Sequence, residues 1–144
     1  MHVEQILNRK GSTVVSVTPE SRIAEALGTL AAHDVGALLV RDGSGKVCGI
    51  LSERDIVRAL AREGEACLSS PVSALMTSEL ICCGPGDSID SVMALMTERR
   101  VRHLPVMTGE RLHGLISIGD VVKHRMEEVQ REAAAMREYI SAAG

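Results

Sequence analysis

The chain has 144 residues, 45% hydrophobic side chains, a single aromatic residue (Tyr139) and a formal net charge of −3. A chain of this length forms one globular domain or two very small ones. It can bury enough surface to fold without stabilising disulfides or metal ions. With 16 Lys and Arg against 19 Asp and Glu, the chain has no excess of positive charge to bind the phosphates of a nucleic acid. It also lacks the aromatic side chains on which the bases of a single strand would stack. We therefore expect a globular protein with an aliphatic core and no nucleic-acid partner.

Membrane spans, secretory signals and metal centres also lack support. No apolar run approaches the roughly 18 residues of a membrane span, and residues 1–5 do not begin a signal peptide. The four cysteines form no C-x-x-C pair and have no His at ligand spacing, which predicts buried, reduced thiols at Cys48, Cys67, Cys82 and Cys83. We expect a cytoplasmic protein with no membrane contact and no metal.

An internal repeat organises the chain. A shift of 66 positions aligns identical residues: Pro19 with Pro85, Ile23 with Ile89, Val35 with Val101, Leu38 with Leu104 and Val40 with Val106. After one deletion the register continues at 65 and aligns Gly49 with Gly114, Ser52 with Ser117, Asp55 with Asp120 and Val57 with Val122. This indicates two copies of a unit of about 50 residues, each burying its open face against the other. We place the first repeat at residues 1–66, the second at 67–126 and a helical extension at 127–144.

Each copy predicts the element order β-α-β-β-α. In the first copy, a short β-branched strand at residues 13–17 precedes a helix that opens near Pro19 and Ser21. A hairpin follows, with strands at 37–41 and 46–51, and a last helix runs from about Glu53 to the helix-ending Gly64.

The second copy repeats this order. Its predicted elements are a strand at residues 80–83, a helix opened by Asp87 and hairpin strands at 103–107 and 111–116. Residues 67–71 are expected to be a linker. The pattern of residues 72–76 resembles that of residues 3–7, which precede the first copy. The predicted fold class is α/β (α+β): two β-α-β-β-α repeats packed as a pseudo-two-fold pair, with a long C-terminal helix.

The last helix is expected to continue from about Ile118 to Ala142, because residues 120–142 contain neither Gly nor Pro. Its apolar positions step by four, three, four, three and four, at Val122, Met126, Val129, Ala133, Met136 and Ile140. This spacing is typical of a coiled-coil seam. It predicts pairing with the same helix of a second subunit; the alternative is that the helix folds back on its own domain.

Candidates for catalysis are few. There is no G-x-S-x-G or H-E-x-x-H motif, and the five histidines are scattered at His2, His33, His103, His113 and His124. Residues 43–46 (GSGK) are similar to part of a phosphate loop, but they lack its full spacing and join two strands. We interpret them as a hairpin turn.

The polar feature that both copies share is a G-h-h-S-x-x-D ending, in which h is apolar. It places Ser52 or Ser117 at the end of a strand and Asp55 or Asp120 in the first turn of the next helix. One interpretation is that the serines are helix N-caps, with Asp in the favourable first turn. The other is a nucleotide site, because free N–H groups at a helix start face an anion, while Asp accepts hydrogen bonds from ribose and Ser donates one to phosphate.

These endings, the strands at residues 35–40 and 101–106 and the element order closely resemble a tandem pair of CBS (cystathionine β-synthase type) domains. The likeness extends from about Val3 to Met126 and is greatest to the stand-alone CBS-pair proteins of bacteria and plant organelles. It implies a sensor that holds AMP, ADP, ATP, NAD(H) or S-adenosylmethionine as a regulatory ligand between the repeats.

The resemblance implies two pseudo-symmetric sites. The first takes Ser52, Arg54 and Asp55 from copy one, with Leu80, Ile81, Val101 and His103 from copy two. The second takes Ser117, Gly119 and Asp120 from copy two, with Val14, Val15, Val35 and Ala37 from copy one. Arg102 and His103 are expected to neutralise phosphate; the alternative is a solvated strand end.

The two sites are not expected to be equal. Gly36 stands where the second copy has Arg102, and Arg54 stands where the second copy has Gly119. Charge-assisted hydrogen bonds of roughly 1.5–3 kcal/mol each would decide occupancy, and we expect the Asp120 site to bind more tightly.

The predicted function is a non-enzymatic regulatory module that binds an adenine nucleotide, senses energy state and signals to an unknown target protein by conformational change. We expect a homodimer formed through the CBS faces and the C-terminal helix. The alternative is a dimeric protein-interaction scaffold with a vestigial cleft. An enzyme acting on a nucleotide has almost no support, because no residue of either cleft is an obvious base or nucleophile.

Overall fold

The computed structural model describes residues 1–143 and separates them into two compact units. Residues 13–81 form the first-repeat unit, and residues 1–12 together with the chain from Cys82 onward form the second-repeat unit. The sequence boundaries had assigned residues 1–12 to the first repeat and residues 67–81 to the second. Each unit therefore includes a segment that comes from the other repeat in the sequence.

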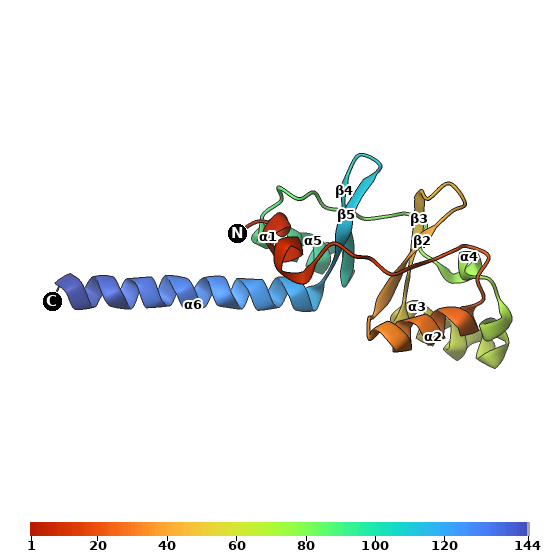
Figure 1. Ribbon diagram of the computed structural model, residues 1–144. Coiled ribbons are helices and arrows are strands. Elements are labelled where there is room, and N and C mark those ends of the chain that lie inside the picture. Colours follow the sequence, from red (N-terminus) through yellow and green to blue (C-terminus); the bar gives the residue numbers. More distant parts are fainter. Residues whose placement is uncertain (144) are drawn as a thin grey trace. The chain divides into compact units, whose positions relative to one another are not determined.

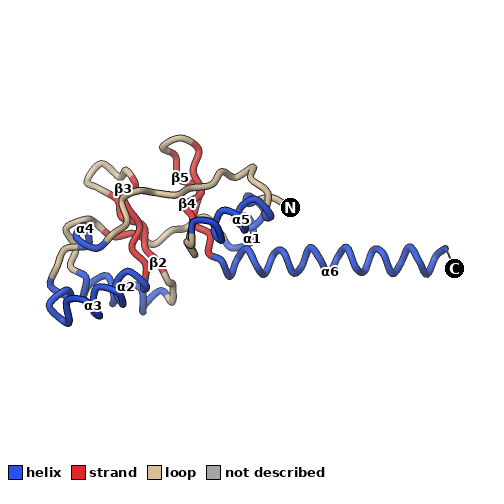
Figure 2. Tube along the Cα trace, turned by 180° about the vertical axis from the view of Figure 1, so that it is seen from behind, coloured by secondary structure: helices blue, strands red, loops and turns tan. Residues whose placement is uncertain are grey.

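The first-repeat unit packs helices against a three-stranded sheet (Figures 1 and 2). Its elements are β1 (Ser16–Val17), α2 (Ile23–His33), β2 (Ala37–Arg41), β3 (Val47–Ser52), α3 (Glu53–Glu63), the 3-10 helix η1 (Gly64–Ser69) and α4 (Val72–Leu75). In the order β1-β2-β3, β1 is parallel and β3 antiparallel to β2. The core is aliphatic, as expected, and consists of Ile23, Ala26, Leu30, Leu38, Val40, Leu51, Ile56 and Val72.

The predicted hairpin and the helix after it are confirmed in this unit. Helix α3 ends at Gly64, whose φ of 71° is a conformation that favours glycine. In the hairpin turn, the Asp42 carboxylate accepts hydrogen bonds from the N–H groups of Ser44 and Lys46. The expected linker at residues 67–71 is instead mostly the end of η1.

The second-repeat unit is built on a two-stranded antiparallel sheet. Its elements are α1 (Val3–Lys10), α5 (Ile89–Arg99), β4 (His103–Thr108), β5 (Arg111–Ser117) and α6 (Ile118–Ala143). The Oγ of Ser88 caps α5 by accepting a hydrogen bond from Ser91 N. Asp87, predicted to open this helix, instead accepts a hydrogen bond from Gly84 N.

The strand predicted at residues 80–83 is wrong: only Cys83 pairs with β4, as an isolated parallel bridge to Val106. In the first repeat, Leu39 N donates a hydrogen bond to Val15 O, which extends the pairing beyond β1. The residue that matches Leu39 is Pro105, which has no N–H. Proline therefore removes the hydrogen bond that would extend the pairing to Ile81.

The short helices that precede the repeats are exchanged between the units. Helix α1 precedes the first repeat but packs in the second-repeat unit, and α4 precedes the second repeat but packs in the first-repeat unit. The same backbone contacts recur: Val3 N donates to Asp87 O at 3.0 Å, and Val72 N donates to Ser21 O at 2.7 Å. The echo between residues 3–7 and 72–76 thus corresponds to two helices in equivalent places.

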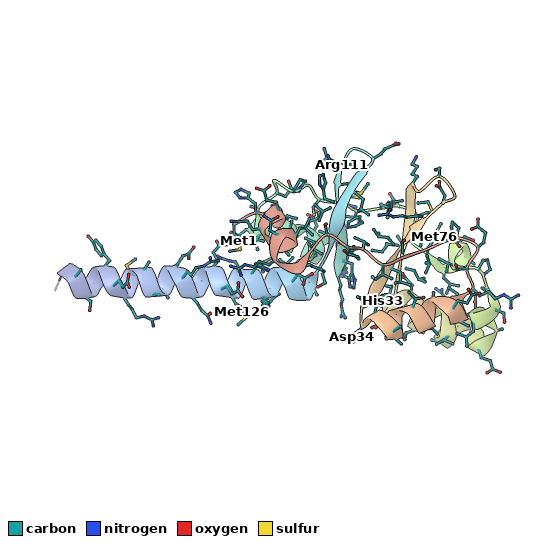
Figure 3. The ribbon with its side chains drawn as sticks, in the orientation of Figure 1. Met1, His33, Asp34, Met76, Arg111 and Met126 are labelled. Atoms are coloured by element: carbon teal, nitrogen blue, oxygen red, sulfur yellow. The ribbon has the colours of Figure 1, made fainter. Side chains whose placement is uncertain are left out.

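Two matched glycines allow these segments to approach the sheets closely. A Cβ on Gly49 in β3 would lie 2.6 Å from Met76 Sδ and 3.1 Å from the backbone oxygen of Thr77. Met76 is labelled in Figure 3. A Cβ on Gly114 in β5 would lie 2.7 Å from Leu7 Cδ2. The glycines that the two repeats share are therefore contact points for the exchanged segments.

We expect Gly49→Ala to destabilise the protein by about 1–3 kcal/mol, because the added methyl overpacks the contact between β3 and Met76. Urea unfolding measures the change. Gly28→Ala is the matched control, since a Cβ at Gly28 meets nothing within 4 Å and Ala favours a helix interior by about 0.5–1 kcal/mol. Equal stability of the Gly49→Ala variant and the parent would contradict the close approach.

None of the helices in the described part of the chain is long and apolar enough to cross a membrane.

Candidate ligand-binding site

Each Ser/Asp ending is a reciprocal capping box at the start of a helix. Ser52 Oγ accepts a hydrogen bond from Asp55 N at 3.2 Å, and Asp55 Oδ2 accepts one from Ser52 N at 3.0 Å. Ser117 and Asp120 make the same two bonds, at 3.2 and 2.9 Å. The capping interpretation is therefore confirmed at both endings. It leaves each serine hydroxyl proton and each Asp Oδ1 outside the capping box.

Strand pairing places predicted residues at the ending of their own repeat, although the resemblance assigned Ala37 to the Ser117 site and His103 to the lining of the Ser52 site. Ser52 pairs with Ala37, and Ser117 pairs with His103. At the first turn of each helix, Glu53 N donates a hydrogen bond to Gly36 O at 2.9 Å and Ile118 N donates one to Arg102 O at 2.8 Å. Gly36 and Ala37 thus lie at the Ser52 ending, and Arg102 and His103 at the Ser117 ending.

The remaining predicted site residues are distributed over both units. Residues 14 and 15 lie beside β2 in the first-repeat unit, and Val35 follows the end of α2 there. Leu80 and Ile81 close the first-repeat unit, and Val101 precedes β4 in the second. Half-buried aliphatic side chains stand at Val14, Val15, Val35, Leu80, Ile81 and Val101, whereas Arg54, Arg102 and Gly119 are exposed. The combination of each ending with strands of the other repeat stays a prediction.

Sequence reasoning missed one residue at the Asp120 ending. Lys10, at the end of α1, donates a hydrogen bond from Nζ to Asp120 Oδ2 at 2.6 Å. The neighbouring Arg9 forms an ion pair with Glu127 on α6. The echo between residues 3–7 and 72–76 was the available signal, but only the exchange of α1 into the second-repeat unit places Lys10 beside Asp120.

The Lys10 contact helps to lower the pKa of Asp120. Burial by itself raises the pKa of this carboxyl, but the hydrogen bonds from Lys10 and from Ser117 N outweigh burial, so the pKa lies below its ordinary value. Asp120 is therefore an anion, and an acceptor of hydrogen bonds, throughout the neutral range.

The two endings carry different charges. Near Asp120 lie three cationic residues, namely Lys10, Arg102 and, three residues along α6, Lys123. Near Asp55, α3 contributes two cationic residues and one further anionic residue, namely Arg54, Arg58 and Glu53. The Asp120 ending is thus the more positive and the better suited to a phosphate.

The adjacent thiols of Cys82 and Cys83 are poorly suited to redox sensing. Burial raises the pKa of Cys82, and burial together with the charge of Asp87 raises the pKa of Cys83 to about 12. Because the thiolate is the reactive form, both groups are in their unreactive state near neutral pH. All four cysteines are unpaired thiols, but only Cys67 and Cys83 are fully buried; Cys48 and Cys82 are half-buried.

The described residues contain no group of three or more His, Cys, Asp or Glu side chains that could hold a metal ion.

Comparison with known proteins identifies the repeated unit. The CBS domain family matches the chain twice, at residues 3–62 and 72–127. A mitochondrial CBS domain-containing protein of Arabidopsis thaliana is 32% identical over 146 residues, covering 96% of this chain and 71% of its own length. Both matches include α1 or α4 together with the repeat that follows it in the sequence.

Solved structures agree with this match. The crystal structure of a CBS-domain containing protein from Agrobacterium tumefaciens is 48% identical, with a TM-score of 0.84, and the match covers 86% of this chain and 92% of the other. A CBS domain protein from Pyrobaculum aerophilum, complexed with AMP, is 25% identical, with a TM-score of 0.73 and coverage of 83% and 89%. The predicted fold, a tandem pair with a long C-terminal helix, is confirmed.

Proposed function

Since the chain belongs to the CBS domain family as a tandem pair, we propose that it is a non-enzymatic regulatory module which binds an adenosine-containing ligand at its Ser/Asp endings. The duplicated ending, with its anionic Asp120 and adjacent cations, is the observation that carries this proposal. The AMP complex of the Pyrobaculum aerophilum relative supports an adenine nucleotide as the ligand class.

The groups at each ending match the parts of a nucleotide. An ionised Asp accepts hydrogen bonds from the two ribose hydroxyls, and its Oδ1 atom is available because the capping box uses Oδ2. The serine hydroxyl accepts from the helix backbone and keeps its own proton to donate to phosphate. The half-buried aliphatic side chains would line the adenine.

We place the tighter of the two sites at Asp120. A phosphate there would meet Lys10 and Arg102, whereas at Asp55 it would meet Arg54 beside the like charge of Glu53. Ligand binding that favours one arrangement of the two repeats would shift the population toward that arrangement, which is how the module would signal energy state to a target protein.

The Lys10 contact separates recognition of phosphate from recognition of nucleoside. We expect Lys10→Gln to weaken AMP binding about tenfold, the loss of one charge-assisted hydrogen bond, and to leave adenosine binding nearly unchanged. Isothermal titration of both ligands measures the two affinities. Lys123→Gln is the matched control, because it removes a charge on the same helix that forms no ion pair with Asp120 among the described residues.

The opposite result would exclude this role for Lys10. If Lys10→Gln binds both AMP and adenosine more tightly than the parent, the lysine competes with ribose for Asp120 and does not contact phosphate.

A second candidate function is a dimeric protein-interaction scaffold, and the surface of α6 favours it. Large apolar side chains on this helix are exposed, including Met136 at 60% and Ile140 at 63%. We propose that the chain forms a homodimer through this helix and through its CBS faces. The two candidates are compatible, and a melting screen with adenine nucleotides separates a sensor from a scaffold whose cleft is vestigial.

A further inference from the structure

Helix α6 presents different residues to its own unit and to solvent. In its first half, Val121 and His124 are buried against the rest of the second-repeat unit. On another face, Val122, Met126 (labelled in Figure 3) and Val129 are 39%, 57% and 46% exposed. From residue 129 to residue 143 every side chain is exposed. The predicted alternative that the helix folds back on its own domain is therefore wrong for this segment.

The exposed apolar residues form one continuous seam. In a heptad written abcdefg, the d positions are Val122, Val129 and Met136, and the a positions are Met126, Ala133 and Ile140. Alternation of a and d over this length is the pattern by which two helices interdigitate. An apolar seam that is two residues wide in every seven is covered by one partner helix with the same seam. The simplest such partner is α6 of a second copy of the chain.

The charges beside the seam distinguish the two possible directions of pairing. The e positions are Lys123, Gln130 and Arg137, and the g positions are Arg125, Glu132 and Tyr139. In a parallel pair, each g residue faces the e residue that lies five positions further along the other helix. Glu132 then faces Arg137 of the second copy twice, once on each side of the coil.

Antiparallel pairing brings like charges together. The register that matches all six seam residues sets Val129 against Ala133 of the second copy. It then places Lys123 against Arg137 twice and Glu132 against Glu132. The parallel arrangement has two attractive pairs, and the antiparallel arrangement has three repulsive ones.

From this charge pattern we infer that two copies of the chain pair in parallel and in register along α6. The inference rests on the proposed homodimer and specifies its direction. A parallel pair places the two second-repeat units at the same end of the coil. The seam spans fewer than three heptads and has a small Ala133 at its centre, so the pair is weak and depends on concentration.

Charge reversal at Arg137 tests the direction, because the two arrangements predict opposite signs for its effect on dimerisation. In a parallel pair, Glu132→Lys and Arg137→Glu each weaken dimerisation about three- to tenfold at low salt, and the double variant recovers the parent affinity. In an antiparallel pair, Arg137→Glu turns both repulsions with Lys123 into attractions and strengthens dimerisation, whereas Glu132→Lys replaces one like-charge pair with another and leaves the affinity nearly unchanged. Sedimentation equilibrium of the full chain over a concentration series measures these changes.

Cross-linking provides a second, independent test. In a parallel pair in register, the Val129→Cys side chains of two copies face each other and form a disulfide under mild oxidation. Glu138→Cys, at the outer f position, is the control and stays uncross-linked. In an antiparallel pair, a mixture of Val129→Cys and Ala133→Cys chains would cross-link with each other while Val129→Cys alone would not. Peptide mass spectrometry identifies the joined residues.

The outcomes distinguish the direction of pairing from the two proposals on which the module rests, the homodimer and ligand binding. A parent chain that stays monomeric at every concentration overturns both the helix-mediated homodimer and its direction. A dimer that Arg137→Glu strengthens, or one in which Val129→Cys fails to cross-link, overturns the direction alone. Ligand binding has its own readout in nucleotide titration, which none of these results changes.

Discussion

We expect AMP or NADH to raise the Tm of the parent protein, and Asp120→Ala to remove most of that rise. The substitution would remove the proposed acceptor for the ribose hydroxyls and release Lys10 from the position that the carboxylate gives it. Charge-assisted hydrogen bonds contribute about 1.5–3 kcal/mol each, so the affinity falls by roughly 10- to 150-fold. Because the Tm shift follows the logarithm of ligand concentration over Kd, most of it is lost at a fixed nucleotide concentration.

The measurement compares each variant with its own unliganded Tm, because loss of the capping box lowers the baseline by itself. Asp55→Ala is the matched control: it removes the same capping bond from the first repeat, and we expect it to retain the larger part of the shift. A full shift in the Asp120→Ala variant would remove this site assignment. Mass spectrometry of small molecules released from the purified protein would identify the ligand directly.

Ile6→Ala is expected to destabilise the protein by about 2–5 kcal/mol. Ile6 is fully buried, and it lies on α1, which packs in the second-repeat unit. Removing its side chain leaves a cavity under the helix that also carries Lys10, so the variant loses packing at the element that positions this proposed ligand contact.

Urea unfolding, followed by circular dichroism, measures the loss. Val57→Ala is the control, because Val57 on α3 is 63% exposed and its truncation should change the stability by less than about 0.5 kcal/mol. If Ile6→Ala unfolds at the same urea concentration as Val57→Ala, α1 does not contribute to the core of the unit.

Local elements were predictable because their signals lie within a few residues of one another. Helix α3 begins and ends where its N-cap serine and its glycine stop indicate, at Glu53 and Glu63. The hairpin strands β2 and β3 were predicted to within one residue at each end, since both are bounded by turn residues and a helix cap. At residues 80–83 the same reasoning failed, because Pro105 withholds a hydrogen bond from a strand that is distant in the sequence.

The candidate site was predictable only in part. Ser52, Asp55, Ser117 and Asp120 stand out because their spacing recurs in both copies, and the structure confirms their capping bonds. Lys10 gave no such signal, because its matching position at Glu79 follows α4 after the helix has ended, so the repeat offers no second example of the contact.

The amino-acid sequence by itself determined the duplication, the order of elements in each repeat, the capped Ser/Asp endings and the apolar seam of α6, because these features depend on spacing along the chain. Tertiary structure alone decided that α1 and α4 exchange places and that Lys10 reaches Asp120. The physical reason is that a short helix buries its apolar face wherever a sheet leaves room for it. Here that room exists because Gly49 and Gly114 have no side chains. That choice depends on contacts between residues far apart in the chain, which no local pattern records.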